Sequence, residues 1–550
     1  MDCCKLLHIF KYAALSMLFP LAAQAQSFTP PMDQQIVFSG NFGEIRADHY
    51  HGGLDFKTGG TVGKVVRALA DGYISRIQVN SGSGLVLTVT FPDGWSAAYR
   101  HLSAFMEPIA SRVKAWQYEH QSWEMELRPQ PDEYPVKAGE QIALSGNTGY
   151  SMGPHLHLDI FNPEGEYIDP LPFFIEKVRD RTAPKVEGFK IYAAPGEGMI
   201  NGKQADKTVP LNAKEPIEVW GRIGVGIRAY DYMDGNHNKY GVKYVTLSVD
   251  SVEVFKSTVD RFAYEENRYI NSWCDGQYMK SFIDPGNKLR MLEALNGQQG
   301  WITIDEERPY HLHYTLSDAL DNTTEVDLVL QGKKQDISPL EVEKEDILHY
   351  DRRNVLQRPG LQLVVPRGAL YTDVYLHYGL RDKDSLAYIY RLTDEAVKLH
   401  TGAELQIGLR TMPVADKSKY HIVRIGKDGR KSSVGGTFED GFLKARILQL
   451  GTFTAEIDTV PPVIKPVEQQ TWAKNGKVTL KADDRETGIS SYTATIDGEW
   501  ALLGKPNSVN NNLVLELDPE HVKKGIQHEL VVTVTDGCGN KTTQRFKFIW

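Results

Sequence analysis

Cysteine is scarce in this chain, because its 550 residues include only four. Cys3 and Cys4 lie within the first 25 residues, which leaves Cys274 and Cys538 far apart in the rest of the sequence. So few cysteines cannot form the disulfide framework of a small exported domain, nor the thiolate ligands of a structural zinc site. A metal site in this protein must therefore use histidine and carboxylate ligands.

Positive charge is not in excess either. Lys and Arg total 62 against 71 for Asp and Glu, which gives a formal net charge of −9. Because phosphate binding needs a basic surface, nucleic acid is not an expected partner. Beyond the N-terminal segment no apolar run is long enough to span a bilayer, so we expect no transmembrane segment in the mature chain.

The composition is that of a folded, multidomain protein. Hydrophobic residues make up 41% and aromatic residues 10% of the sequence, which is too apolar for disorder. At roughly 150 residues per domain, the length predicts about three or four domains. Short runs rich in β-branched residues alternate with Gly, Pro, Asn and Asp turns, so the predicted fold is mostly β.

The first 25 residues have the features of a secretory signal peptide. Lys5 and Lys11 precede or flank an apolar stretch, and the small residues Ala23 and Ala25 stand before Gln26. A membrane anchor is the alternative, but the run is short and Pro20 interrupts it. We therefore predict cleavage after residue 25 and export, most simply to the periplasm, with secretion as the other outcome.

An internal repeat organises the rest of the chain. Asp180-Arg-Thr-Ala-Pro184 is echoed by Asp458-Thr-Val-Pro-Pro462, and Asp318-Ala-Leu-Asp-Asn322 is echoed by Asp536-Gly-Cys-Gly-Asn540. Between these motifs, Ala229-Tyr-Asp231 matches Ala482-Asp-Asp484 in the same order. The closing pattern, a Thr-rich alternating strand that runs into an Asp/Asn/Gly turn, resembles bacterial immunoglobulin-like domains, which are β-sandwiches.

These boundaries predict the following units: a signal peptide at 1–25, a first domain at 26–179, immunoglobulin-like sandwiches at 180–335 and 458–550, and an additional β-sandwich-like domain at 345–457. An aromatic and acidic insertion at 107–135 lies inside the first domain. It is expected either to border a substrate groove, as a lid or regulatory element, or to pack against a neighbouring domain.

The first domain carries a candidate metal motif, His51-Gly-Gly-Leu-Asp55. An imidazole and a carboxylate stand close together, with two glycines that free the backbone between them. Zinc accepts both ligand types. Alone the motif is weak, since His and Asp near glycines usually mark a polar turn.

A second motif supplies the missing ligand. His155-Leu-His157-Leu-Asp159 alternates as a strand does, so its three polar side chains share one face. With His51 and Asp55, one of the paired histidines completes three protein ligands, the open arrangement of catalytic zinc. Asp159 either orients His157 or is an ordinary surface residue at the strand end.

Together the motifs resemble the lysostaphin-like, or β-lytic, zinc metalloendopeptidases, which cut peptide bonds in peptidoglycan. The resemblance spans about residues 40–172, and it also rests on Ser39-Gly-Asn-Phe-Gly43, Val66-Arg-Ala68, Asp71-Gly72, Val136-Lys-Ala-Gly139 and Gly146-Asn-Thr-Gly149. It implies an antiparallel-sheet metallopeptidase domain that binds Zn2+ through His51, Asp55 and His157. It further implies that His155 is the general base and that His101, in Tyr99-Arg-His101, is an additional catalytic histidine at the oxyanion.

The leading hypothesis is thus an exported zinc endopeptidase that acts on peptidoglycan stem peptides or cross-links. The β-sandwich modules are expected to place it at the wall or on a cell-envelope protein partner. Two alternatives stay open: a non-catalytic regulator of wall hydrolases, and a zinc peptidase that acts on secreted proteins. A second H-x-H pair, His311 and His313, has no H-x-x-x-D companion and is expected to be ordinary strand surface.

Overall fold

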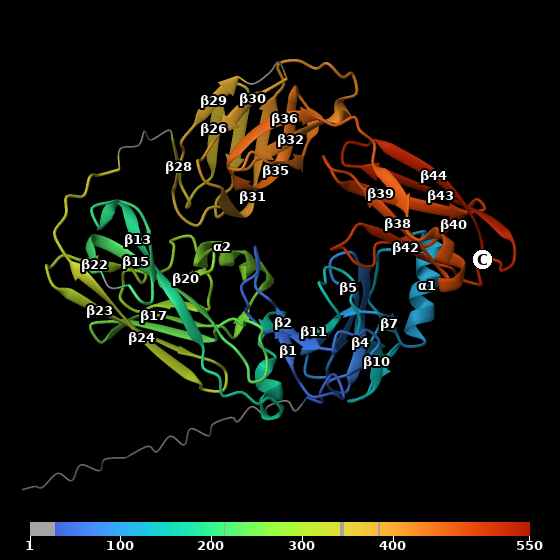
Figure 1. The fold of residues 1–550 in the computed structure, drawn as a ribbon, viewed down its shortest axis with the longest axis horizontal. Helices are drawn as coiled ribbons and strands as arrows, with labels where there is room; N and C mark the ends of the chain where they lie inside the picture. The colour runs from blue at the N-terminus through green and yellow to red at the C-terminus, as the bar shows by residue number, and fades with distance from the viewer. Residues whose placement is uncertain (1–27, 214, 341–345, 383–385) are drawn as a thin grey trace, which may run out of the picture.

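The computed structural model describes residues 28–213, 215–340, 346–382 and 386–550. The predicted signal peptide lies outside them. The described chain is mostly β, as expected, and it contains four separate hydrophobic cores. We name the units N-terminal domain (28–179), second module (180–340), third module (346–457) and C-terminal module (458–550). Figure 1 shows them arranged in a ring, in which the C-terminal module (red) returns to the N-terminal domain (blue).

The N-terminal domain is built on one large antiparallel sheet with the order β1-β2-β11-β6-β5-β4-β8. Leu156, Leu158 and Ile160 of β11 are fully buried in the core, so the alternate residues of this strand face the other side. The strands are β1 Phe38–Gly40, β2 Gly53–Lys57, β4 Gly72–Asn80, β5 Gly84–Thr90, β6 Ser96–Leu102, β8 Met125–Leu127, β9 Pro135–Val136, β11 His155–Phe161 and β12 Tyr167–Ile168. A small sheet contains β3 Val65–Arg67, β7 Ala104–Phe105 and β10 Gln141–Leu144.

The second module forms an eleven-stranded sheet, and its core also includes Phe42 and Tyr50 of the N-terminal domain. Its strands are β13 Lys185–Ile200, β14 Lys207–Pro210, β15 Ile217–Tyr230, β16 Tyr244–Val249, β17 Val252–Thr258, β19 Cys274–Asp275, β20 Tyr278–Lys280, β21 Leu292–Ala294, β22 Ile302–Ile304, β23 Pro309–Ser317 and β24 Thr323–Gly332. Helix α2 covers Ile270–Trp273. A further strand, β18 (Arg261–Phe262), pairs with β12 and so joins the sheet of the N-terminal domain.

The third module contains two five-stranded sheets and a two-stranded pair. One sheet has the order β26-β27-β31-β35-β34 and the other β29-β30-β36-β32-β33. The bounds are β25 Ile347–Leu348, β26 Asn354–Arg358, β27 Leu361–Val365, β28 Val374–Tyr375, β29 Gly379–Asp382, β30 Tyr388–Arg391, β31 Val397–Gly408, β32 Tyr420–Ile425, β33 Lys431–Gly435, β34 Thr437–Glu439, β35 Phe442–Leu450 and β36 Thr452–Ile457.

The C-terminal module packs two four-stranded sheets over Trp472 and its neighbours. Its order β40-β39-β43-β44 repeats the order β17-β16-β23-β24 of the second module, in agreement with the repeat in the sequence. The bounds are β37 Val463–Pro466, β38 Lys477–Asp483, β39 Ile489–Ile496, β40 Glu499–Trp500, β41 Leu503–Gly504, β42 Asn512–Glu516, β43 Gln527–Asp536 and β44 Lys541–Ile549, with helix α3 at Trp472–Asn475.

The insertion at 107–135 packs against the C-terminal module. It contains helix α1 (Ile109–His120), whose Tyr118 ring stacks on His521 with centroids 3.5 Å apart. Lys114 of the same helix forms an ion pair with Glu520 at 3.0 Å. These contacts match the expectation of a packed insertion. Within the described residues, no helix combines the length and the apolar character needed to cross a bilayer.

Candidate metal centre

Two paired strands bring the candidate ligands together. In the antiparallel pairing of β2 with β11, Asp55 lies directly opposite His157, and His51 stands in the loop just before β2. The glycines between His51 and Asp55 permit this pairing, since a Cβ on Gly53 would lie 2.1 Å from the Leu158 carbonyl oxygen. Close approach of the two strands therefore explains Gly53, while a Cβ on Gly52 would lie 2.7 Å from the ring of Tyr167.

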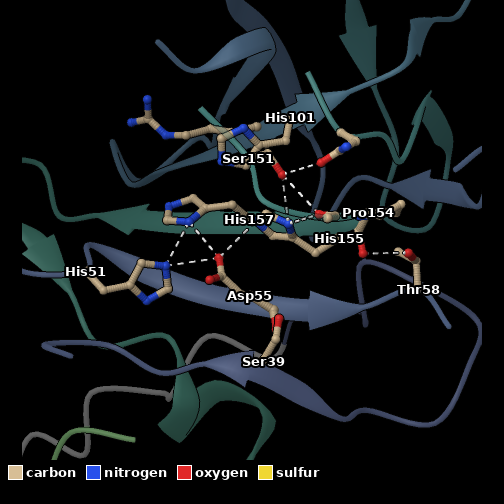
Figure 2. A network of polar contacts seen from close by, with 12 residues as sticks. Ser39, His51, Asp55, Thr58, His101, Ser151, Pro154, His155 and His157 are labelled. Atoms are coloured by element: carbon tan, nitrogen blue, oxygen red, sulfur yellow. Dashed lines mark hydrogen bonds and ion pairs between the residues drawn. The ribbon is translucent and has the colours of Figure 1, made fainter. Parts of the chain in front are cut away.

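The three side chains converge on one point (Figure 2). His51 Nε2 lies 3.0 Å from Asp55 Oδ1 and 3.0 Å from His157 Nδ1, and the His157 nitrogen lies 2.9 Å from the same carboxylate oxygen. All three residues are more than nine-tenths buried. The structure thus brings together the three residues that the family resemblance implied as metal ligands.

The outer nitrogen of each histidine is already engaged. His51 Nδ1 lies 2.6 Å from the Asn41 carbonyl oxygen, and His157 Nε2 lies 2.6 Å from Asp159 Oδ1. Because both partners are acceptors, the outer nitrogens carry the protons and the inner ones present lone pairs. Three acceptors that face one another at about 3 Å repel unless a cation lies among them, so the donor set fits a metal ion such as zinc.

Asp159 is held in place from behind. Arg100 Nε donates to Asp159 Oδ2 at 2.5 Å, and Arg100 Nη1 donates to Ser83 Oγ at 2.8 Å. Although burial opposes ionisation, the charge of Arg100 holds the pKa of Asp159 well below its usual range. The sequence left the role of Asp159 open between orientation and surface; the structure places it, 1% exposed, behind His157.

His155 and His101 flank the cluster and are both held by the loop 147–153. His155 Nδ1 lies 2.8 Å from the Gly153 carbonyl and 3.3 Å from Ser151 Oγ, while its Nε2 lies 3.4 Å from Asp55 Oδ1. His101 Nδ1 lies 2.7 Å from the Thr148 carbonyl. The centroids of the His101 and His155 rings are 4.8 Å apart. In both, Nδ1 donates to a carbonyl, so the neutral ring keeps Nε2 unprotonated.

His101 has an unusual backbone and electrostatic environment. Its φ of +60° lies in the left-handed region, which turns the ring out of the regular alternation of β6. Burial lowers the pKa of His101 to about 3. A neutral His101 with Nδ1 donating cannot also donate from Nε2, which is a departure from the oxyanion donor that the resemblance implies.

The cluster opens into a cleft of about 1280 Å³. Tyr150 and Met152, on the loop 147–153, line it with side chains 68% and 82% exposed. Arg46 Nη2 lies 3.5 Å from Asp55 Oδ2 on another side. Such exposed apolar groups beside a polar centre suit the binding of an extended chain rather than of a small enclosed molecule.

Sequence reasoning missed several of these groups. Arg100, Ser151 and Arg46 carry no motif that marks them, and Thr148 acts through its carbonyl, which no sequence pattern reveals. Other histidines stay outside the centre: His49 pairs with Asp48 on the surface, and His120 stacks on Trp116. His313 forms an exposed pair with Asp327, as expected for strand surface.

Comparison with known proteins gives partial matches. The chain is 34% identical over 156 residues to an uncharacterized metalloprotease of Haemophilus influenzae, which covers 28% of this chain and 26% of that one. It is 33% identical over 131 residues to the glycyl-glycine endopeptidase ALE-1 of Staphylococcus capitis, covering 22% and 28%. The chain thus spans about a quarter of the length of these curated relatives.

A solved structure and a family model also match parts of the chain. The catalytic domain of lysostaphin from Staphylococcus simulans is 25% identical, with a TM-score of 0.19, and the match covers 26% of this chain and 92% of that domain. Residues 345–458 match a Zu5-like domain. The homologues of this chain are lysostaphin-like metallopeptidases.

Proposed function

We propose that this protein is an exported zinc endopeptidase that cleaves peptide bonds in peptidoglycan stem peptides or cross-links. The observation that carries the proposal is the triangle of His51, Asp55 and His157, whose three inner atoms are all acceptors 2.9–3.0 Å apart. Histidine and carboxylate ligands without cysteine are those of catalytic zinc. When bound there, zinc lowers the pKa of water from 15.7 to about 7 and polarises a carbonyl.

The chain itself supplies the proton transfers. His155 presents an unprotonated Nε2 beside the triangle, because its Nδ1 is committed to the Gly153 carbonyl. It can therefore accept the proton of an attacking water and return it to the leaving amine. Since Asp55 Oδ1 lies 3.4 Å away, the resulting imidazolium is stabilised by a carboxylate.

His101 faces the same space from β6 and offers a second unprotonated Nε2. In the neutral state it acts as an acceptor that can orient the water or a substrate N–H. We propose it as the second catalytic histidine, acting in this neutral form.

The substrate assignment is supported by the cleft and by the relatives. Tyr150 and Met152 offer exposed apolar surface along an open cleft, which suits an extended peptide. One relative is named a glycyl-glycine endopeptidase. The predicted signal peptide would bring such an enzyme to the cell wall.

The experiment compares the mature chain with His155→Ala on purified peptidoglycan. Zinc per chain and new amino termini are measured, with casein as a protein substrate and His313→Ala as the control for an exposed histidine. We expect about one zinc in all three proteins and release of new amino termini from peptidoglycan by all but His155→Ala. Cleavage of casein alone would overturn the substrate assignment, and a zinc-loaded wild type without any activity would overturn the enzyme assignment.

A further inference from the structure

A second cluster of ligand atoms lies at the start of the second module, away from the histidines. One carboxylate oxygen from each of Asp180, Asp231 and Asp318 lies within 4.8 Å of the others. All three residues are at least nine-tenths buried, at 7%, 7% and 2% exposure. They come from three distant segments that the fold brings together, and these are the positions at which the sequence repeat is strongest.

One member of the cluster is unsatisfied. Asp231 Oδ1 is buried and has no hydrogen-bond partner, whereas Asp318 accepts hydrogen bonds on both oxygens, from Asn322 and from the backbone. No Lys, Arg or His side chain among the described residues forms an ion pair with any of the three. The unpaired oxygen of Asp231 lies beside two further buried carboxylates, an arrangement that a cation would compensate.

We propose that Asp180, Asp231 and Asp318 bind one calcium ion. The donor set is all oxygen, which favours a hard cation over zinc. Calcium accepts irregular oxygen sets at about 2.3–2.6 Å and dehydrates readily, while magnesium keeps several waters and suits open sites. The equivalent aspartates Asp458, Asp484 and Asp536 also cluster, but Asp458 Oδ2 there accepts from Thr487 Oγ1 at 2.7 Å.

The test measures calcium bound per full-length chain by equilibrium dialysis for wild type, Asp231→Asn and Asp234→Asn. Asp234 lies in the same loop, carries the same charge change and is outside the cluster. We expect Asp231→Asn to bind one calcium fewer than the other two proteins, and calcium to raise the melting temperature of wild type by about 5 °C at hundredfold excess over Kd. Equal stoichiometry in all three, or no binding up to about 10 mM, would overturn the proposal.

An independent observation concerns the C-terminal module. Asn507 Nδ2 donates to the carbonyls of Asn147 at 2.8 Å and Ser151 at 3.0 Å. The backbone of the same segment pairs with Gly149, whose N–H donates to Pro506 and whose carbonyl accepts from Ser508. Gly149 has a φ of +73°, and a Cβ there would lie 2.3 Å from Gly84 N. Side chain and backbone together hold residues 147, 149 and 151 of the loop 147–153.

That loop holds both histidines of the proposed proton transfers. Thr148 positions His101 through its carbonyl, and Gly153 with Ser151 positions His155. Ser151 Oγ also donates to Asn147 Oδ1 at 2.7 Å, which links the two ends of the loop. A contact from a segment 360 residues away in sequence therefore reaches the centre through one short loop.

We infer that Asn507 is a positioning residue for His101 and His155, an inference that rests on the proposed function for its catalytic meaning. Hydrogen exchange of residues 147–153 is compared in full-length wild type, Asn507→Ala and Asn511→Ala. Asn511 is the matched control, since its side chain bonds only to Asp483 within the C-terminal module. Loss of two hydrogen bonds predicts about tenfold faster exchange of the loop in Asn507→Ala alone.

Activity then separates this inference from the proposed function. We expect Asn507→Ala to lower kcat about tenfold with KM and zinc content nearly unchanged, because the ligands lie on β2, on β11 and before β2. Unchanged exchange of the loop would overturn the positioning role whatever the activity. Faster exchange in an inactive wild type would overturn only the proposed function, and faster exchange with unchanged kcat would overturn the catalytic part of the inference.

Discussion

The two copies of the repeated module meet the N-terminal domain in different ways. The second module shares a hydrophobic core with it: Phe42 and Tyr50 pack against Phe262, and β12 pairs with β18. The C-terminal module instead contacts it through polar groups and the insertion, as at Asn507 and Lys114. Modules with a similar strand order therefore form two different joints with the N-terminal domain. One joint is part of a hydrophobic core, and the other holds the loop 147–153 beside the candidate metal centre.

The two joints should therefore affect different properties: one the folding stability of the molecule, the other the conformation of the loop 147–153. An apolar joint is not easily opened, because each buried aromatic side chain contributes several kcal/mol. The joint of the C-terminal module combines ring contacts of Tyr118 with hydrogen bonds at Asn507. Those hydrogen bonds contribute little to folding but can hold a loop in one conformation. Changes at the joint with the second module should thus lower the free energy of unfolding. Changes at the joint with the C-terminal module should alter the candidate metal centre of the N-terminal domain.

The largest effect is expected at the centre itself, independent of either joint. Asp55→Ala removes the carboxylate that both His51 and His157 face, so zinc content should fall close to zero and peptidase activity by more than about 10³-fold. Bound zinc and peptidoglycan cleavage measure this. Asp48→Ala, an exposed aspartate that pairs only with His49, should keep both. A zinc-loaded Asp55→Ala would contradict the ligand set.

His101→Ala should come next in size. It removes a ring held by the loop that the C-terminal module fixes, so kcat should fall by about 10²–10³ while zinc content stays near one. Steady-state kinetics with metal analysis distinguish this from ligand loss. A kcat within threefold of wild type would leave His155 as the only catalytic histidine.

Breaking the apolar joint should affect folding instead. Phe262→Ala removes a fully buried ring that contacts Phe42, Tyr50 and Tyr167, and we expect a loss of about 3–5 kcal/mol in unfolding free energy. Urea unfolding followed by tryptophan fluorescence measures it. Tyr264→Ala, an aromatic residue 70% exposed nearby, should change stability by less than about 0.5 kcal/mol.

Asp159→Asn should weaken the metal site without removing a ligand. The carboxylate of Asp159 accepts hydrogen bonds from His157 Nε2 on one oxygen and from Arg100 Nε on the other, whereas an amide has only one oxygen acceptor. Zinc affinity should therefore fall about 10–100-fold. Competition with a chelator measures the affinity. An unchanged affinity would mean that Asp159 serves only the packing of Arg100.

The sequence predicted the centre better than its surroundings, for physical reasons. Alternation in His155-Leu-His157-Leu-Asp159 predicts one strand face, and spacing places His51 near Asp55. The choice of His157 over His155 as the ligand came from the family resemblance, because local pattern does not distinguish the two. Ser151, Thr148 and Asn507 act through backbone carbonyls and long-range contacts, which depend on where distant loops meet. The repeat could be seen in the sequence because Asp180 and Asp458 open matching motifs in the two modules. The different contacts that the two modules make with the N-terminal domain could not be seen there.

The smallest effect is expected at the edge of the joint with the C-terminal module. Lys114 pairs with Glu520, which is 74% exposed, and with Asp518, so solvent screens much of the attraction. Lys114→Ala should lower unfolding free energy by less than about 1 kcal/mol and leave kcat within about threefold of wild type. Asn507→Ala in the same joint should slow catalysis more, because Asn507 reaches the loop of the histidines and Lys114 does not. Equal slowing by both variants would show that docking of the whole module, rather than the contact of Asn507, controls the centre.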